Sequence, residues 1–449
     1  MKNSFSILLV CLLAVTSGAW SPRENWRAKV DPALLELAEQ GAAPELLKEK
    51  ADLRGAGAYR RKTAKGRFVY EQLRTTAGRS QAGLLAWLQR EGIPHRPFFI
   101  VNAIWTRGGL DLIRRIAVRE EVATLQYNPP MTFHRPGAEP AGVRLREEAE
   151  WGIRRIKADR VWELGIRGQG AVVAGADTGY DWEHPALRRQ YRGNQGDTVL
   201  HDYHWYDAIR EISPVHGDSL PSPDLNPCGL DVRIPCDDNG HGTHTMGTMV
   251  GDDGLGNQIG VAPDARWMAC RNMERGYGSP ATYIDCFEFF LAPTALNGEF
   301  PNPALAPHVI NNSWGCPPME GCNPANFSTM DKAVEALRAA GVVVVASAGN
   351  SGSKCSTIDD PAAIFNAAFT IGATKPNDSI AAFSSRGPVT VDGSLRLKPD
   401  VVAPGVGVRS ALPGDRYASF SGTSMAGPHV AGVVALMISA NPDLAGQVD

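Results

Sequence analysis

The sequence feature that most constrains the fold is a set of short, almost wholly apolar segments that end in small or polar residues. Three of them read GAVVAGADTG, PHVINNSWG and GVVVVASAGN. Segments that are apolar at every position are typical of parallel strands covered by helices on both faces. Two of the covering helices are expected in STMDKAVEALRAAG and HVAGVVALMISAN. We therefore expect an α/β fold with a mainly parallel central sheet in residues 151–449.

The N-terminus has the features of a secretory signal. It combines one lysine, an apolar run from Ile7 to Val15, and small residues at Ser17 and Ala19. The run is too short to anchor the mature protein in a membrane. We expect residues 1–19 to be removed and the protein to be secreted, into the medium or into a periplasm if the host has an outer membrane.

The cysteine content fits an exported protein. Eight cysteines are present, and seven remain when Cys11 of the signal segment is set aside. Disulfides are favoured outside the cytosol, and Cys228 with Cys236, or Cys316 with Cys322, would close short loops. The sequence does not fix the pairing. A zinc site is the alternative, but no C-x-x-C or clustered Cys/His spacing supports it.

Three regions lie between the signal segment and the main domain. Residues 20–66 are basic and mostly helix-like, and residues 67–134 predict a compact α+β unit. This unit is expected to contain a helix in SQAGLLAWLQREG, a strand in RPFFIVNAIW, a helix in GGLDLIRRIAVREE and a strand in VATLQYNPP. Residues 135–150 are rich in proline, glycine and charge and predict an exposed linker. The formal net charge of −3 and the absence of a basic stripe argue against nucleic-acid binding.

Four polar residues lie where parallel sheets bind ligands, at strand ends and helix entrances. Asp177 and Asn350 each end an apolar run, His241 lies in a glycine-bounded turn, and Ser424 begins a buried helix. Each alone has a simpler interpretation as a turn, core or capping residue. Together they supply an orienting carboxylate, a base, a nucleophile and an oxyanion donor for acyl transfer. An α/β-hydrolase is excluded, because the order is Asp, His, Ser and residue 426 is alanine instead of the glycine of G-x-S-x-G.

Three longer segments resemble the signature segments of subtilisin-like serine proteases, the subtilases. They read VVAGADTGYDWEHPAL, NGHGTHTMGTMVG and SGTSMAGPHVAG. The resemblance runs from about Trp151 to the C-terminus, with most likeness to the bacillopeptidase F-like branch. It implies a three-layer subtilisin-like fold, a triad of Asp177, His241 and Ser424, and an oxyanion site formed by Asn350 and the Ser424 N–H. The helical region of the family continues past the position of Asp449, so we expect the domain to be incomplete there.

The resemblance also implies how a substrate binds. Family members pair an extended peptide with two strand edges, which correspond to Ser313-Trp314-Gly315 and Gly276-Tyr277-Gly278. The segment Ser347-Ala348-Gly349 would line the pocket for the residue that precedes the scissile bond. The alternative is that the glycines at these strand ends serve only to let the chain turn. Alignment places Asp359 at the pocket floor, where a carboxylate would favour Lys or Arg. An outward-facing Asp359, in a turn before Pro361, is the alternative.

The N-terminal regions resemble an inhibitory propeptide. Residues 20–134 would form a small ferredoxin-like α+β domain that blocks the cleft until the chain is cut between His134 and Trp151. The expected partners are therefore protein or peptide substrates and the chain's own propeptide. We expect no nucleic acid, no membrane anchor and a monomer.

No cofactor is expected for the chemistry, but a structural calcium ion is an option. The loop GDDGLGNQIGVAP corresponds to a calcium loop of many subtilases, and Asp252, Asp253 and Asn257 supply oxygens. A long insertion between Asp177 and His241 is expected to shape the rim of the cleft. Its histidines lack a matching fourth ligand for a metal.

Two other functions compete with a protease. A peptide-binding module without catalysis is disfavoured, because every chemical group of the triad is present. An esterase or amidase that acts on small molecules is disfavoured by the peptide-pairing segments and by the propeptide. The sequence therefore predicts a secreted serine endopeptidase that processes its own precursor.

Overall fold

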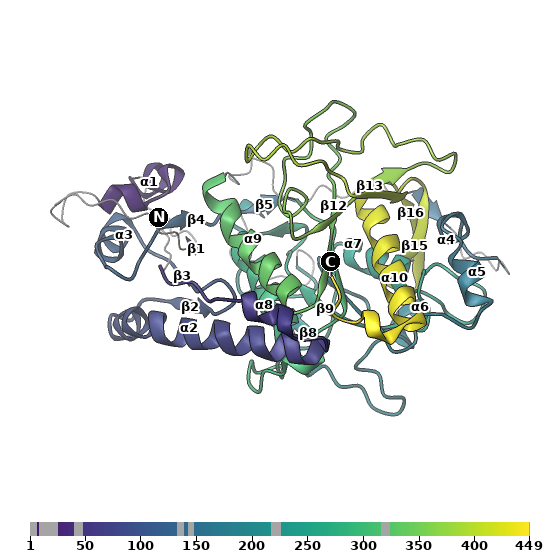
Figure 1. The fold of residues 1–449 in the computed structure, drawn as a ribbon, viewed down its shortest axis with the longest axis horizontal. Helices are drawn as coiled ribbons and strands as arrows, with labels where there is room; N and C mark the ends of the chain where they lie inside the picture. Colours follow the sequence, from purple (N-terminus) through teal and green to yellow (C-terminus); the bar gives the residue numbers. More distant parts are fainter. Residues whose placement is uncertain are drawn as a thin grey trace.

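A seven-stranded sheet, parallel throughout, forms the centre of the protein (Figure 1). The computed structural model describes residues 7–8, 26–39, 48–132, 139–141, 148–216, 226–315 and 324–448. The strands lie in the order β14 (Val401–Pro404), β13 (Phe369–Thr374), β12 (Val343–Ser347), β11 (Val309–Asn312), β7 (Val172–Asp177), β9 (Arg266–Arg271) and β8 (Trp205–Asp207). The predicted parallel sheet is confirmed.

Helices cover both faces of this sheet and enclose two hydrophobic cores. They are α7 (His241–Val250) and α10 (Thr423–Ala440) on one face, and α8 (Pro280–Leu291) and α9 (Pro324–Ala339) on the other. Alternate strand residues face opposite cores: Val344 and Ala346 pack on the side of α8 and α9, and Val345 on the side of α7 and α10. Burial on both faces explains why the strand sequences are continuously apolar.

Helix α10 is a core helix. Its length and composition would allow it to cross a membrane, but 67% of it is buried inside the protein. Among the described residues it is the only helix that meets this criterion. Burial in the core of the protein explains its apolar composition.

Shorter elements connect the layers. The helices among them are α4 (Trp151–Arg155), α5 (Ala158–Trp162), α6 (Pro185–Arg188), η3 (Pro214–His216), η4 (Pro303–Leu305) and η6 (Pro442–Leu444). The hairpin of β15 (Val408–Leu412) and β16 (Arg416–Phe420) leads into α10, and β6 (Glu139–Ala141) pairs with its second strand. The hairpin therefore positions the start of α10.

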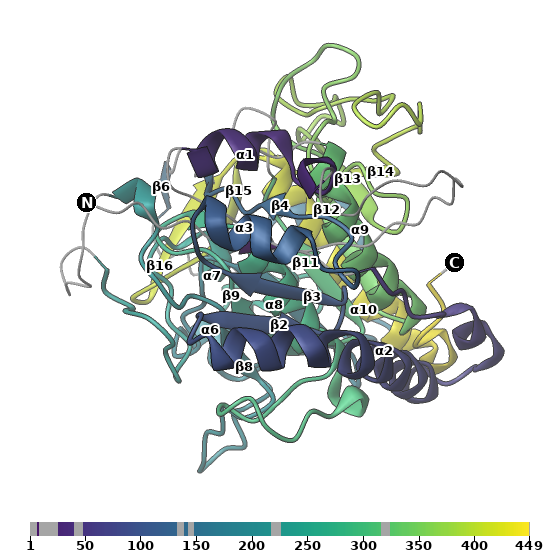
Figure 2. The same cartoon turned by 90° about the vertical axis from the view of Figure 1, so that its left-hand side faces the viewer.

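The described part of residues 20–132 packs against α8 and α9, and Figure 2 turns it toward the viewer. Its elements are η1 (Trp26–Lys29), α1 (Pro32–Glu39), η2 (Arg54–Ala58), α2 (Lys62–Arg90), β2 (His95–Phe98), β3 (Ala103–Thr106), α3 (Leu110–Ala117), β4 (Gln126–Tyr127) and β5 (Met131–Thr132). Strand β4 pairs with β1 (Ile7–Leu8). We call residues 26–132 the N-terminal unit; its role as a propeptide and the removal of residues 1–19 remain predictions.

The prediction of one strand in RPFFIVNAIW is wrong. The segment forms the hairpin of β2 and β3, with a turn at residues 99–102 in which Asn102 has a φ of +52°. Two N–H groups of this turn donate to Glu288 of α8. Because the turn is buried against another part of the chain, its sequence is as apolar as the strands and does not reveal the reversal.

Candidate active site

The carboxylate of Asp177 lies at the end of β7, at the carboxyl edge of the central sheet. Strand β7 lies between β11 and β9, and Asp177 is 1% exposed. Its Oδ1 accepts a hydrogen bond from Thr178 N at 2.8 Å, and its backbone carbonyl accepts one from Asn272 N at 2.9 Å. The sheet and the following turn therefore fix the position of this carboxylate.

The capped start of α7 positions the imidazole of His241. Asp237 Oδ1 accepts hydrogen bonds from Gly240 N at 2.7 Å and from Thr178 Oγ1 at 2.9 Å, and its Oδ2 accepts one from Thr243 N at 3.0 Å. A carboxylate in this position satisfies N–H groups that a helix start leaves unpaired. Asp237 is thus a capping residue that ties α7 to the turn after β7.

His241 and Asp177 form a buried hydrogen-bonded pair. His241 Nδ1 lies 2.7 Å from Asp177 Oδ1 and 2.9 Å from Oδ2, and the histidine is completely buried. Donation from Nδ1–H to the carboxylate leaves Nε2 as the basic nitrogen of the ring. The structure therefore brings these two predicted residues together in the arrangement of an orienting acid and a base.

Ser424 is the second residue of α10, and α10 packs against α7. The side chain is 3% exposed, and its Oγ donates to the Ser313 carbonyl at 3.2 Å. In return, Ser313 Oγ donates to the Ser424 carbonyl at 3.1 Å. These reciprocal bonds connect the start of α10 to the chain after β11. Its position in the first helical turn leaves the Ser424 N–H outside the hydrogen-bond ladder of the helix.

Asn350 lies beside the start of α10 with its amide held in one orientation. Its Oδ1 accepts hydrogen bonds from Thr423 N at 2.9 Å and Thr423 Oγ1 at 3.1 Å. The Nδ2 donors take no part in these bonds, and the residue is exposed. The amide can therefore present N–H donors to a ligand that reaches Ser424 from the surface.

The predicted substrate-binding segments lie at three strands, β11, β12 and β10 (Tyr277–Gly278). Ser313, Trp314 and Gly315 follow β11, and the ring of Trp314 stacks on Tyr283 with centroids 3.9 Å apart. Ser347 ends β12, and Ala348 and Gly349 follow it. Gly276, with a φ of +87°, precedes β10.

Strand β10 already has a partner in the structure. It pairs in antiparallel register with β5 of the N-terminal unit, Tyr277 opposite Thr132 and Gly278 opposite Met131. Met131 is completely buried. The edge that the sequence assigns to substrate is thus occupied by the chain itself, through strand addition.

The carboxylate that lies beside these segments differs from the one that sequence alignment placed there. It belongs to the loop between β12 and β13. Asp360 Oδ2 lies next to both Gly315 and Gly349. Burial raises the pKa of the Asp359 carboxyl. The assignment of Asp359 to the pocket floor stays a prediction, and the contacts favour Asp360.

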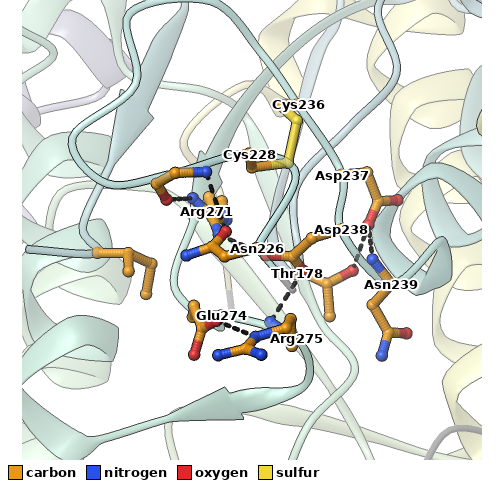
Figure 3. Close-up of polar contacts among 12 residues, drawn as sticks. Thr178, Asn226, Cys228, Cys236, Asp237, Asp238, Asn239, Arg271, Glu274 and Arg275 are labelled. Carbon is orange, nitrogen blue, oxygen red and sulfur yellow. Dashed lines mark hydrogen bonds and ion pairs between the residues drawn. A yellow bond between two sulfur atoms is a disulfide. The ribbon is translucent and has the colours of Figure 1, made fainter. Parts of the chain in front are cut away.

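The insertion between Asp177 and His241 contains an ion-pair network that sequence reasoning missed. Arg271 ends β9 and is completely buried; it pairs with Asp207 at 3.2 Å and with Asp238, and donates to the Gly229 carbonyl at 3.0 Å (Figure 3). Burial raises the pKa of Asp238 to about 6, and the charge of Arg271 opposes that rise. The network joins β8, the insertion and the turn before His241. The sequence signal that could have revealed the network is Arg271 itself, a charged residue at the end of an apolar segment.

Two disulfides lie in the described residues. Cys228–Cys236 closes the end of the insertion, and the Cys236 carbonyl accepts from Tyr180 N at 3.1 Å. Cys270–Cys286 joins β9 to α8. Cys316 and Cys322 lie outside the described residues, so their expected bridge remains a prediction.

The other histidines of the signature segments have structural partners. His429 Nδ1 lies 2.8 Å from the Met425 carbonyl, and burial lowers its pKa to about 4. His184 caps α6, and His244 Nε2 bonds two carbonyls of the β15–β16 hairpin. His429 therefore does not serve Ser424 as a base.

The loop aligned with a calcium site uses its oxygens within the protein. Asp252 pairs with Arg167 at 3.2 Å, Asn257 Oδ1 accepts from Arg409 at 2.7 Å, and Asp253 Oδ2 accepts from Asn257 Nδ2 at 2.6 Å. In the described part of the chain, no group of three or more His, Cys, Asp or Glu side chains is arranged to hold a metal. Arginines among these oxygens do not favour a cation there.

Comparison with known proteins identifies the family. The model of the subtilase family matches residues 168–448. Bacillopeptidase F of Bacillus subtilis (strain 168) is 34% identical over 432 residues, which are 91% of this chain but 28% of that protein, so the chain spans little more than a quarter of its length. M-protease of Shouchella clausii (strain KSM-K16) is 34% identical over 72% of this chain and 68% of its own length. Subtilisin Savinase of Lederbergia lenta is 35% identical over 66% and 86%. The chain belongs to the subtilase family, the subtilisin-like serine endopeptidases.

Proposed function

We propose that this chain is a secreted serine endopeptidase that hydrolyses peptide bonds with Ser424, His241 and Asp177 and processes its own precursor. The observation that supports it most is the buried His241–Asp177 pair, 2.7 Å between Nδ1 and Oδ1, at the edge of the sheet where Ser424 begins α10. Side chains and backbone groups supply every part of this chemistry, so no cofactor is required for it.

In the first half of the reaction, Ser424 Oγ attacks the carbonyl carbon of the scissile bond while His241 Nε2 takes the hydroxyl proton. Asp177 stabilises the imidazolium that forms. The tetrahedral oxyanion is bound by Asn350 Nδ2 and the Ser424 N–H, and the N-terminal end of α10 favours its negative charge. The C–N bond then breaks, His241 gives its proton to the leaving amine, and an acyl-enzyme ester remains on Ser424.

In the second half, water replaces the amine. His241 Nε2 takes a proton from the water as its oxygen attacks the ester carbonyl, and the same donors bind the second oxyanion. The ester bond to Ser424 breaks, and the proton returns to Oγ. The enzyme ends in its starting state with the new carboxylic acid released.

The N-terminal unit acts as an intramolecular inhibitor in this proposal. Its strand β5 pairs with β10, the edge assigned to substrate, and Ala281 N of α8 donates to Asn128 Oδ1 at 2.9 Å. A peptide cannot pair with β10 while β5 does. Release therefore requires a cut after β5, in the segment between His134 and Trp151.

The direct test is to incubate the purified chain and follow its N-terminus and its action on casein. We expect a new N-terminus between residues 134 and 151, followed by casein hydrolysis. An intact chain that hydrolyses no casein, with the fold verified by circular dichroism, contradicts the proposal. A small-ester substrate distinguishes an esterase, which would cleave the ester and leave casein intact.

Asn350 is expected to stabilise the transition state without strengthening substrate binding. Replacing it with alanine removes the Nδ2 donors and should lower kcat by about 10²–10³-fold with little change in KM, the size of effect known for such donors. Asn350→Asp is the matched control for structure, because it keeps the acceptor for Thr423 N. Since it also lacks the donors, it should be as slow as the alanine variant. Wild-type kcat in either variant contradicts the role.

Glu288 is expected to make inhibition by the N-terminal unit depend on pH. Its Oε2 accepts from Phe99 N at 2.6 Å and Ile100 N at 3.0 Å. Burial raises its pKa from 4.5 to about 7, although these N–H groups and the charges of Arg96 and Arg74 lower it. Docking thus favours the protonated form, so inhibition should strengthen as pH falls from 8 through 7 toward 5, by up to about 100-fold.

The pH dependence of inhibition is measured on the cleaved chain with its N-terminal fragment still present. At each pH its activity is divided by the activity of enzyme from which the fragment has been removed. Glu288→Gln cannot ionise and should flatten the dependence. Glu299→Gln changes a carboxyl outside this contact and should leave the dependence unchanged. Inhibition that weakens on acidification in the wild type contradicts the assignment.

A further inference from the structure

A carboxylate lies between the two segments expected to line the pocket for the residue that precedes the scissile bond. It belongs to Asp360, in the loop between β12 and β13. A Cβ atom placed on Gly315 would lie 2.9 Å from Asp360 Oδ2, and one placed on Gly349 would lie 3.7 Å from the same oxygen. Because these glycines follow the paired strands β11 and β12, the carboxylate lies between two neighbouring strand ends.

The surrounding backbone leaves room for this carboxylate. A Cβ on Gly315 would also lie 3.2 Å from Asp360 Cβ and Cγ, so any side chain at residue 315 would displace it. Gly349 has a φ of +96°, which side chains disfavour, and its carbonyl accepts from Ser385 N at 3.0 Å. Glycine at residue 315 is therefore a condition for the carboxylate to lie where it does.

The same strand ends position the proposed nucleophile and the oxyanion donor. Ser313, two residues before Gly315, exchanges hydrogen bonds with Ser424, and Asn350 directly follows Gly349. The residue that precedes the scissile bond contributes the carbonyl held between Ser424 and Asn350. Its side chain therefore enters the space beside the two glycines, which is where the carboxylate lies.

We infer that Asp360 selects lysine or arginine at the residue preceding the scissile bond; the inference rests on the proposed function and assigns its substrate class. Asp360 is only partly exposed, and a carboxylate shielded from water attracts a cation more strongly than one in bulk solvent. A guanidinium or ammonium group can form charge-assisted hydrogen bonds with its oxygens. Acidic side chains in the same place are repelled.

Sequence alignment alone pointed to the neighbouring Asp359, so the two carboxylates form a matched pair for the test. Asp360→Asn keeps the size of the side chain and removes its charge. Asp359→Asn makes the same change one residue away, in the same loop between β12 and β13. Peptides identical except for Arg, Lys, Phe or Glu before the scissile bond report on specificity, and casein reports on overall activity.

The wild type and Asp359→Asn are expected to prefer the Arg and Lys peptides over Phe, and to cleave Glu least. In Asp360→Asn, kcat/KM for the Arg peptide should fall by roughly 10- to 150-fold, the equivalent of one charged hydrogen bond, while the Phe peptide changes less than about threefold. Binding of benzamidine, an amidinium compound, to the cleaved enzyme should weaken in Asp360→Asn only.

The outcomes separate the specificity from the proposed function. Casein hydrolysis without a preference for Arg, or loss of that preference in Asp359→Asn alone, overturns the inference and leaves the protease assignment intact. No hydrolysis of casein or peptides, with benzamidine binding that still depends on Asp360, overturns the protease assignment and supports the cation site. Loss of both activity and benzamidine binding in the wild type overturns both.

Discussion

Replacing Ser424 with alanine is expected to lower kcat for peptide hydrolysis by about 10⁶-fold, the size of effect known for the nucleophile of subtilisin, a relative of this chain. The substitution removes the only group that forms the acyl-enzyme in the proposed mechanism. It should also stop self-cleavage, so the variant should stay at its full precursor length. Stability should change little, because Ser424 Oγ makes one hydrogen bond, to the Ser313 carbonyl.

The measurement compares casein hydrolysis and intact mass for the wild type, Ser424→Ala and Ser421→Ala. Ser421 is a matched control: it lies three residues earlier, and its exposed Oγ accepts from Gly407 N at 2.9 Å. Ser421→Ala should process and hydrolyse like the wild type. Equal activity in Ser424→Ala and the wild type contradicts the proposed nucleophile.

Replacing Asp177 with asparagine is expected to lower kcat by about 10⁴-fold. The shape is preserved, and Oδ1 can still accept from Thr178 N. However, an amide cannot stabilise the imidazolium of His241, and its N–H favours the wrong tautomer of the ring. The effect should fall on kcat more than on KM, because Asp177 is 1% exposed at the strand end and does not reach the substrate.

The matched control is Asp181→Asn. Asp181 carries the same charge in the turn after β7, where it accepts from Glu183 N and Gly414 N. Its replacement should leave kcat within about threefold of the wild type. Steady-state kinetics of both variants on one peptide test the distinction, and equal losses contradict the assignment of Asp177 as the orienting carboxylate.

The layers of the main domain could be predicted from sequence because burial on both faces is written directly into the strands. Val343–Ser347 is apolar at nearly every position, since alternate residues face two different cores. Strand β8 (Trp205–Asp207) escaped prediction, because three residues at the sheet edge within a polar insertion have no such pattern. The hairpin of β2 and β3 escaped it for the opposite reason: its turn is buried and apolar.

The proposed catalytic residues could be named from sequence because each ends an apolar strand or begins a buried helix. Asp177 and His241 are 64 residues apart, yet the strand end and the helix start bring them within hydrogen-bonding distance. The network of Arg271 could not be named in this way, since its three partners come from separate segments that meet only in the fold. For the same reason sequence alignment pointed to Asp359, because the turn of the loop that brings Asp360 beside the glycines is formed only in the fold.

The central claim is that Ser424 is a nucleophile activated by His241 and Asp177. The most direct measurement is to treat the cleaved enzyme with diisopropyl fluorophosphate and to locate the adduct by peptide mass spectrometry. Attack of Oγ on phosphorus displaces fluoride, so we predict one diisopropylphosphoryl group, on Ser424, with parallel loss of casein hydrolysis. The His241→Ala variant should react far more slowly. An unmodified Ser424 in fully inhibited enzyme, or an adduct on another residue, would contradict the account.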